Sequence, residues 1–165
     1  MIKLRQLDPI SDVIALQSVL EAAPQYALNI LGHPQEAGAA ADVFAALPLE
    51  FPKTNKYVFG IHHGESLIGC IDLLRGFPTP NSAHIGLLLI KESAQGRGFG
   101  QAAFQKVEEL IRTWSEISTL RLGVVETNRV VLGFWLKQGF NLTEKAVPYE
   151  HKTVHSRVLI LEKTI

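Results

Sequence analysis

The sequence predicts an α+β fold built on a mixed β-sheet. Two segments with strand composition lie close together and are joined by a short turn, which indicates an antiparallel hairpin. Further strand segments alternate with helical segments, which indicates strand–helix–strand connections. The chain has 165 residues, 47% of them hydrophobic, so we expect a single domain over residues 1–165 with a full core.

The first elements are a strand and two helices. Residues 2–7 alternate apolar and polar side chains, as a half-buried strand does. Asp8-Pro9 suits the cap and first position of a helix, and apolar residues recur at helical spacing over 13–20. A second helix is expected at about 35–46.

Three strands are expected in the middle of the chain. Residues 57–62 and 66–74 are rich in β-forming residues and are joined by His62-His63-Gly64-Glu65, which suits a hairpin turn. Residues 83–90 form a third, strongly apolar segment. This order places a hairpin before the first strand–helix–strand unit.

The last third alternates helices and strands. Apolar residues over 103–114 fall on one helical face, and 120–125 is another strand. Asn128 can cap the next helix, and Gly139 sits where that helix should end. Two closing strands are expected at 140–147 and 157–163.

Composition and charge limit the classes of partner that we expect for this chain. Sixteen basic and sixteen acidic residues balance, so a small-molecule partner is favoured over nucleic acid. One cysteine, Cys70, excludes an internal disulfide, fits a reducing compartment and is expected in the core. The start lacks an apolar leader, and the longest apolar run, 85–90, is too short for a membrane span. We expect a cytoplasmic protein without membrane or metal partners, and leave a homodimer open.

A glycine-rich segment carries the first chemical signal. Gly96, Gly98 and Gly100 directly precede the amphipathic helix, and without Cβ atoms their backbone can approach a ligand closely. The first N–H groups of a helix have no internal partner and favour a phosphate group. Arg97 adds a positive charge.

Two other interpretations of this segment are open. It can be a turn that only reverses the chain. Gly98, Gly100 and Ala103 also satisfy the dinucleotide pattern G-x-G-x-x-A, with Glu126 ending the next strand. Against that pattern, residues 91–97 separate the strand from the first glycine of the pattern, and the motif follows a hairpin instead of opening a βαβ unit.

At these residues the chain resembles the GNAT superfamily of acyl-CoA-dependent N-acetyltransferases. Gln95-Gly96-Arg97-Gly98-Phe99-Gly100 is similar to its Q/R-x-x-G-x-G/A motif. The segment from Asn128 to Phe140 is similar to its N-x6-Y-x3-G-F segment. The order of elements is also similar, from Ile2 to Lys163. The resemblance implies about seven strands, mostly antiparallel, flanked by about four helices, with a V-shaped splay between the central parallel strands.

The resemblance also implies how acetyl-CoA is held. The pantetheine arm would pair with backbone groups of Leu88, Leu89 and Ile90, and Asn128 would contact the arm, unless it is simply a helix cap. A backbone N–H near Leu89 or Ile90 would stabilise the oxyanion during direct attack by an amine. The pyrophosphate would rest on the amides of Gln95, Gly96, Arg97, Gly98, Phe99 and Gly100.

Two residues are candidates for proton handling. His84 lies eleven residues before Gln95, where the histone-acetylating branch has a glutamate base, and its imidazole suits that role. The alternative is a half-exposed strand histidine without function. Trp135 stands where many relatives have a tyrosine that protonates the leaving thiolate. Its indole N–H can donate a hydrogen bond to sulfur or pack against the arm, but it is no acid.

The acceptor site is expected near Tyr26, Asp72 and Tyr149, with His151 as a further candidate. The sequence favours transfer of an acetyl group to a primary amine of a small molecule. Acetylation of a protein N-terminus or lysine is one alternative. A non-catalytic acyl-CoA sensor is another, because position 135 lacks the tyrosine.

Overall fold

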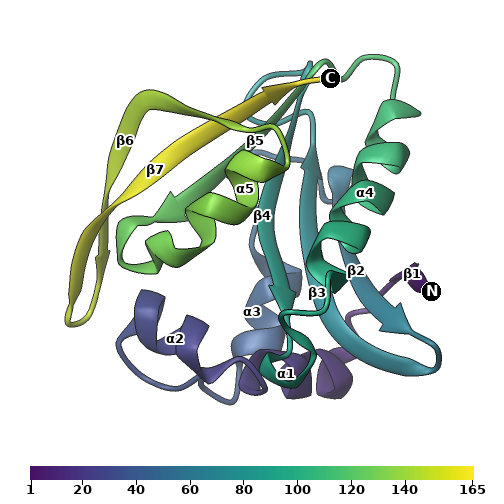
Figure 1. Cartoon of the computed structure of the whole chain (residues 1–165), viewed down its shortest axis with the longest axis vertical. Helices are drawn as coiled ribbons and strands as arrows, with labels where there is room; N and C mark the ends of the chain where they lie inside the picture. Colours follow the sequence, from purple (N-terminus) through teal and green to yellow (C-terminus); the bar gives the residue numbers. More distant parts are fainter.

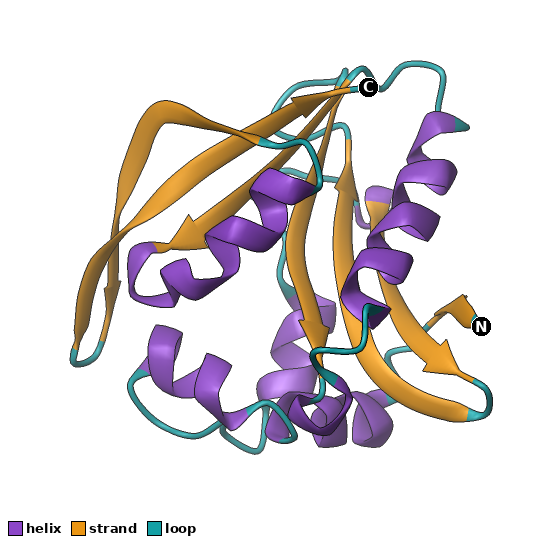
Figure 2. Ribbon diagram, viewed as in Figure 1, coloured by secondary structure: helices purple, strands orange, loops and turns teal.

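The computed structural model describes all residues, 1–165, and its sheet has seven strands. The strands run in the order β1-β2-β3-β4-β5-β7-β6 across the sheet (Figures 1 and 2). Only β4 and β5 are parallel neighbours, and every other pair is antiparallel. The bounds are β1 (Ile2–Gln6), β2 (Lys56–His63), β3 (Ser66–Arg75), β4 (Ser82–Ile90), β5 (Thr119–Val125), β6 (Asn141–His151) and β7 (Val154–Thr164).

Five α-helices and three short 3₁₀ segments connect these strands, which confirms the α+β class with a mixed, mostly antiparallel sheet. α4 and α5 cover one face of the sheet, and α1 and α3 lie against the other (Figure 1). Their bounds are α1 (Val13–Glu21), α2 (Pro24–Leu31), α3 (Ala39–Ala45), η1 (Lys53–Asn55), η2 (Glu92–Ala94), α4 (Phe99–Arg112), η3 (Glu126–Val131) and α5 (Leu132–Lys137). No helix has the length and apolar character that a membrane crossing requires.

The central strand β3 divides the core between the two faces. Its side chains alternate, so that Ile71 and Leu73 join the cluster with α4, while Cys70 joins the cluster with α1. Cys70 is fully buried, as expected, and burial raises the pKa of its thiol to about 12. Because the sheet is covered on both faces, β4, its fourth strand, packs against both clusters.

The parallel strands β4 and β5 diverge partway along their length, which confirms the expected V-shaped splay. They pair from Ser82 opposite Thr119 to Ile85 opposite Leu122, and no pairing continues beyond. The pairing of β4 with β3 shifts register at Gly86, where β4 has a bulge. Figure 1 shows the two arrows separating below the paired region.

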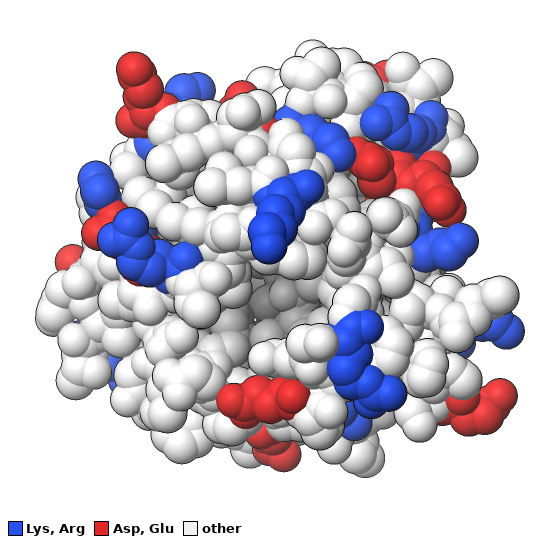
Figure 3. All heavy atoms as spheres, viewed as in Figure 1, with Lys and Arg blue, Asp and Glu red and all other residues white.

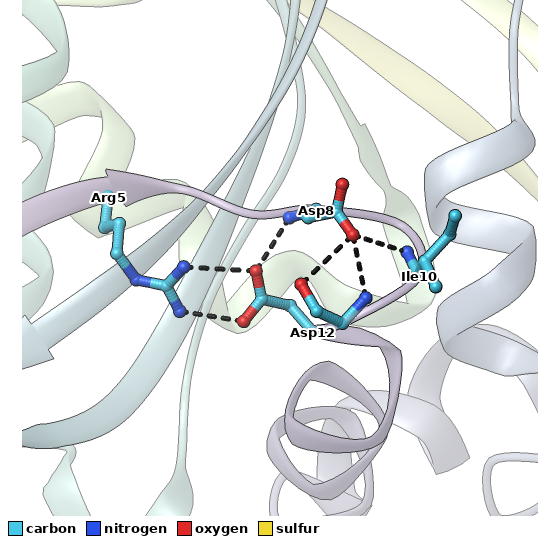
Figure 4. A network of polar contacts seen from close by, with 5 residues as sticks. Arg5, Asp8, Ile10 and Asp12 are labelled. Atoms are coloured by element: carbon cyan, nitrogen blue, oxygen red, sulfur yellow. Dashed lines mark hydrogen bonds and ion pairs between the residues drawn. The ribbon is translucent and has the colours of Figure 1, made fainter.

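The first helix begins later than expected, because two aspartates build a turn before it (Figure 4). Asp8 accepts hydrogen bonds from the backbone N–H and hydroxyl of Ser11. Asp12 accepts the backbone N–H of Asp8 and pairs with Arg5 at 2.8 Å, which lowers the pKa of Asp12 to about 2. The helix α1 therefore starts at Val13.

The expected set of helices lacked α2. This helix has Pro24 in its first turn and ends at Gly32, which has a left-handed φ of 76°. The helix expected at 35–46 is the shorter α3. The expected cap at Asn128 is wrong, since Asn128 lies within η3 and α5 begins after it without a side-chain cap. Gly139 does follow the end of α5, with a φ of 94°.

Candidate active site

A cleft of about 670 Å³ lies between the splayed strands. Its walls come from β4, the end of β5, the glycine-rich loop, α2, η3 and α5. Figure 3 shows a hollow in this face of the molecule, bordered mostly by uncharged atoms. Only two lining side chains carry charge, Glu92 and Lys137. The volume of the cleft is that of a ligand site. Its walls offer a ligand chiefly backbone groups, side-chain amides and apolar surface.

The glycine-rich loop forms one end of the cleft. Gly96 and Gly98 have φ values of 73° and 79°, and a Cβ at either position would meet nothing within 4 Å. The glycines are therefore required by the backbone conformation and not by lack of space. The side chain of Gln95 donates to the carbonyl of Ile90 at 2.8 Å, which ties the loop to the end of β4.

The loop leads into the N-terminus of the 14-residue helix α4. Its first internal hydrogen bond runs from Ala102 to Gly98, so the N–H groups of Phe99, Gly100 and Gln101 have no helical partner. These three residues line the cleft. The helix dipole adds positive potential at the same point, so the arrangement suits a phosphate group. Arg97 is exposed outside the lining, with its guanidinium 4.9 Å from the Phe99 ring centre.

The strand β4 offers an open edge to the cleft. Beyond Ile85, one side of β4 stays paired with β3, and the side facing β5 is unpaired. Leu88, Leu89 and Ile90 lie in this stretch and line the cleft. An unpaired strand edge can bind an extended chain through its backbone groups.

Asn128 and Trp135 lie on the wall formed by η3 and α5. Trp135 is 6% exposed, and its ring packs edge-on against Phe134, Phe104 and Phe140 at centroid distances of 4.9, 5.7 and 5.3 Å. Asn128 is 9% exposed. The rigid ring gives the cleft an apolar wall where many relatives of the resembled superfamily have a tyrosine hydroxyl.

The structure does not bring His84 into the cleft. His84 lies on the paired part of β4, next to Arg121 on β5, whose Nη1 is 3.4 Å from His84 Nδ1. Its ring meets Phe77 edge-on at 5.6 Å. Burial lowers the pKa of His84 to about 4, and Arg121 contributes in the same direction. The imidazole is therefore neutral, and it is absent from the lining residues.

Of the three acceptor residues expected, only Tyr26 lines the cleft. Burial raises the pKa of its phenol well above the usual value. Asp72 instead pairs with Lys56 at 2.8 Å, behind the cleft. Burial raises the pKa of Asp72, and Lys56 opposes that shift. A Cβ on Gly86 would meet the Asp72 carboxylate at 2.9 Å, so this pair lies directly against the bulge of β4.

Tyr149 lies on the β6–β7 hairpin and ties this hairpin to α2. Its hydroxyl donates to the carbonyl of Ile30 at 2.6 Å. His151 Nε2 is 3.3 Å from His33 Nε2, and Lys152 pairs with Glu36 at 2.9 Å. Tyr149 and His151 do not line the cleft.

Sequence reasoning named Tyr26 but missed the other lining residues of α2, since it missed the helix. The signal was present in Pro24 and Gly32, because proline is frequent at the first helical position and glycine just past the last. The lining residues that α2 adds besides Tyr26 are Gln25, Asn29 and Ile30.

Comparisons with known proteins agree with this geometry. The sequence pattern of the Acetyltransferase (GNAT) family matches residues 21–140, most of the chain. A search of curated proteins gives no match. An acetyltransferase from Thermus thermophilus has a similar structure, with a TM-score of 0.76 and 23% identity, covering 100% of this chain and 97% of the other.

Two further structures share the fold at lower identity. The ribosomal-protein-S18-alanine N-acetyltransferase from Escherichia coli has a TM-score of 0.73 and 14% identity, covering 100% of this chain and 94% of the other. The PaiA N-acetyltransferase from Thermoplasma acidophilum, solved with coenzyme A, has a TM-score of 0.69 and 19% identity, covering 100% of this chain and 99% of the other. The family match favours acetyl-CoA over a dinucleotide as the ligand of this chain. The chain belongs to the GNAT family of acetyltransferases, which use acetyl-CoA as the acetyl donor.

Proposed function

We propose that this enzyme moves the acetyl group of acetyl-CoA to a primary amine of a small molecule, by direct attack in a ternary complex. The observation that carries the proposal is one continuous cleft, with the glycine loop at one end and α2 at the other. Donor and acceptor can meet there without a covalent enzyme intermediate. Cys70, the single thiol, is fully buried in the core and is not needed as a nucleophile.

The cofactor would lie along the backbone of the cleft. We place its pyrophosphate on the amides of residues 95–100 and its pantetheine arm along Leu88, Leu89 and Ile90. The thioester would then lie near Leu89 or Ile90, where a backbone N–H can stabilise the oxyanion. Trp135 would pack against the arm. The thiolate can leave unprotonated, since an ordinary thiol has a pKa of about 8.5.

The hairpin contacts support a small acceptor. Tyr149 joins the β6–β7 hairpin to Ile30 at the end of α2. His151 and Lys152 contact His33 and Glu36, which follow the helix. These contacts would leave less room for a folded protein surface. The lining of α2 is neutral, with Gln25 and Asn29 as its hydrogen-bonding amides. Such a wall recognises an acceptor by hydrogen bonds and shape.

A protein N-terminus is the second candidate acceptor. The cleft has no histidine and only one carboxylate, Glu92, among its lining residues. An α-amino group has a pKa of about 7.7–8.0, so a large fraction is neutral at physiological pH, in contrast to lysine at about 10.4. The structural neighbour from Escherichia coli acts on an alanine of a ribosomal protein.

Thiol release from acetyl-CoA separates these candidates. The panel contains small primary amines, peptides with a free N-terminus, and lysine peptides whose N-terminus is blocked. A sample without amine is the blank. The proposal predicts fastest thiol release with a small amine, confirmed by the mass of the product. Preference for peptide N-termini would favour the second candidate. If the protein binds acetyl-CoA but releases no CoA thiol in the presence of any amine of the panel, the sensor is supported and the proposal is overturned.

The position of His84 predicts that it is not the general base. We expect His84→Gln to leave kcat/KM within about threefold of wild type between pH 6.5 and 9, because the neutral ring lies outside the cleft. A pH–rate profile checks this. A rate that falls at neutral pH and recovers at high pH would restore His84 as the base.

His84 should instead influence acid stability. Its folded-state pKa of about 4 lies below the ordinary histidine value of 6.5, so the unfolded chain takes up the proton first. The stability due to neutral His84 is therefore present above about pH 6.5 and is lost as the pH falls towards 4. Urea unfolding should show a weaker pH dependence over this window in His84→Gln than in wild type.

We further propose a cytoplasmic enzyme that needs no membrane or nucleic-acid partner. The balanced charge of the chain and its single buried cysteine support this assignment. A homodimer stays an open prediction, which sedimentation at micromolar concentration would decide.

A further inference from the structure

A chain of side-chain amides crosses from α2 to η3. The Nε2 of Gln25 donates to Oδ1 of Asn29 at 2.8 Å. The Nδ2 of Asn29 then donates to Oδ1 of Asn128 at 3.1 Å, across 99 residues of sequence. All three residues line the cleft. The bridge therefore connects the acceptor-side helix with the wall that faces the cofactor.

The bridge uses the oxygen end of the Asn128 amide. A carboxamide accepts through its oxygen and donates through its NH2 group. Gln25 donates to the oxygen of Asn29, and the NH2 of Asn29 donates to the oxygen of Asn128. The NH2 group of Asn128 remains available as a donor. Asn128 is 9% exposed, so few water molecules compete for it.

We propose that Asn29 is a positioning residue, which holds the Asn128 amide with its NH2 towards the amide carbonyls of the pantetheine arm. This inference rests on the proposed binding of acetyl-CoA in the cleft. Asn29 itself touches Asn128 and not the arm. It makes the affinity for the donor depend on a helix that forms the acceptor side.

Substitution of Asn29 separates orientation from simple loss of a contact. Asn29→Ala frees the Asn128 amide to rotate, and we expect acetyl-CoA to bind about threefold more weakly. Asn29→Asp can only accept, so it attracts the NH2 of Asn128 and turns the oxygen towards the cleft. We expect about tenfold weaker binding for this variant. Calorimetric titration of the unliganded enzyme measures both, without any need for turnover.

A double variant tests whether the effect of Asn29 on acetyl-CoA binding acts through Asn128. In an Asn128→Ala background, Asn29→Asp should weaken binding no further, because the amide that it turns is gone. Leu28→Asp is the matched charge control, since Leu28 is exposed on the same helix and does not line the cleft. It should bind like wild type. In steady state, Asn29→Asp should raise the KM for acetyl-CoA more than it lowers kcat.

Each outcome is decisive for one claim. If wild type fails to bind acetyl-CoA, the proposed function fails. If wild type binds and Asn29→Asp binds equally well, or if the loss persists in the Asn128→Ala background, the positioning role is overturned. Thermal unfolding shows whether each variant folds. Gln25→Ala is a second variant, which leaves Asn128 intact and should weaken binding about twofold by releasing Asn29.

Discussion

The two sides of the cleft are built differently. The cofactor side consists of backbone: the free edge of β4, the loop at Gly96 and Gly98, and the first amides of α4. The acceptor side consists of side chains from α2, held by contacts from the β6–β7 hairpin. A backbone site depends on conformation, and many sequences that keep the glycines can form it. A side-chain site depends on particular residues that lie far apart in the chain.

This difference suggests a division of roles. In the proposed function, the backbone side would bind the donor, which every reaction shares, and the side-chain side would be free to change with the acceptor. Substitutions on the two sides should therefore differ in effect: those at the loop should weaken donor binding, and those around α2 should act mainly on the acceptor and on the stability of the fold. Asn29 is the proposed exception, because its hydrogen bond to Asn128 crosses to the wall that would face the donor.

The largest effect is expected at the buried Lys56–Asp72 ion pair, which lies against the bulge of β4. Lys56→Met leaves the Asp72 carboxylate without its partner, and the two side chains are only 6% and 15% exposed. We expect a loss of about 3 kcal/mol in the free energy of unfolding, because an uncompensated charge stays buried. Denaturant unfolding at pH 7 gives the value.

Two controls accompany this substitution. Lys106→Met removes an exposed pair with Glu109 and should cost less than about 1 kcal/mol. The double variant Lys56→Met/Asp72→Leu should recover most of the loss, since an apolar pair replaces both charges. A Lys56→Met protein as stable as wild type would show that Asp72 is hydrated or neutral, and would return it to consideration as an acceptor ligand.

The next effect is expected on the cofactor side. Gly98→Val forces a β-branched residue into a left-handed conformation with a φ of 79°. The strain is about 1–2 kcal/mol, which the loop avoids by changing shape, so we expect roughly tenfold weaker binding of acetyl-CoA. Titration calorimetry measures the dissociation constant.

The open space around Gly98 makes this test specific. A Cβ there meets no atom within 4 Å, so the valine acts through backbone conformation and not through a clash within the protein. Gly38→Ala is the matched control, because Gly38 also has open space but an ordinary φ of −91°. It should bind acetyl-CoA like wild type. Unchanged affinity in Gly98→Val would mean that the donor does not use this loop conformation.

The same contrast explains what the sequence could predict. The glycine spacing and the helix after it are local, so the loop at 95–100 and α4 were predictable from neighbouring residues. The strands of the hairpin and the splayed β4 also follow from local apolar patterns. The start of α1 could not be predicted from such local patterns, because Asp8 and Asp12 form a turn whose shape depends on Arg5 in the preceding strand.

The acceptor side was less predictable for a physical reason. Asp72 was expected to bind the acceptor, but its partner Lys56 lies on another strand, 16 residues away. His84 has the expected offset from the loop, yet its location depends on where β4 separates from β5, after Ile85. Contacts of this kind are set by packing between distant segments, which spacing in one sequence does not encode.

The smallest effect is expected at the contact between the hairpin and α2. Tyr149→Phe removes the hydrogen bond to the carbonyl of Ile30 and should cost about 1 kcal/mol in the free energy of unfolding. Because the contact holds α2 and not the glycine loop, the KM for the amine should rise, while the dissociation constant of acetyl-CoA stays within about twofold. Steady-state kinetics with the best amine of the panel and calorimetry with the donor measure the two quantities.

Lys152→Met gives the matched control for this hairpin. Its pair with Glu36 is exposed on both sides, at 57% and 69%, so its loss should cost less than about 0.5 kcal/mol and leave the KM for the amine unchanged. If Tyr149→Phe weakens donor and acceptor equally, the hairpin acts on the whole cleft through α2, and the two sides are not separable. If only the amine is affected, the half-buried Tyr149 contact, and not the surface charge pair, positions the acceptor helix.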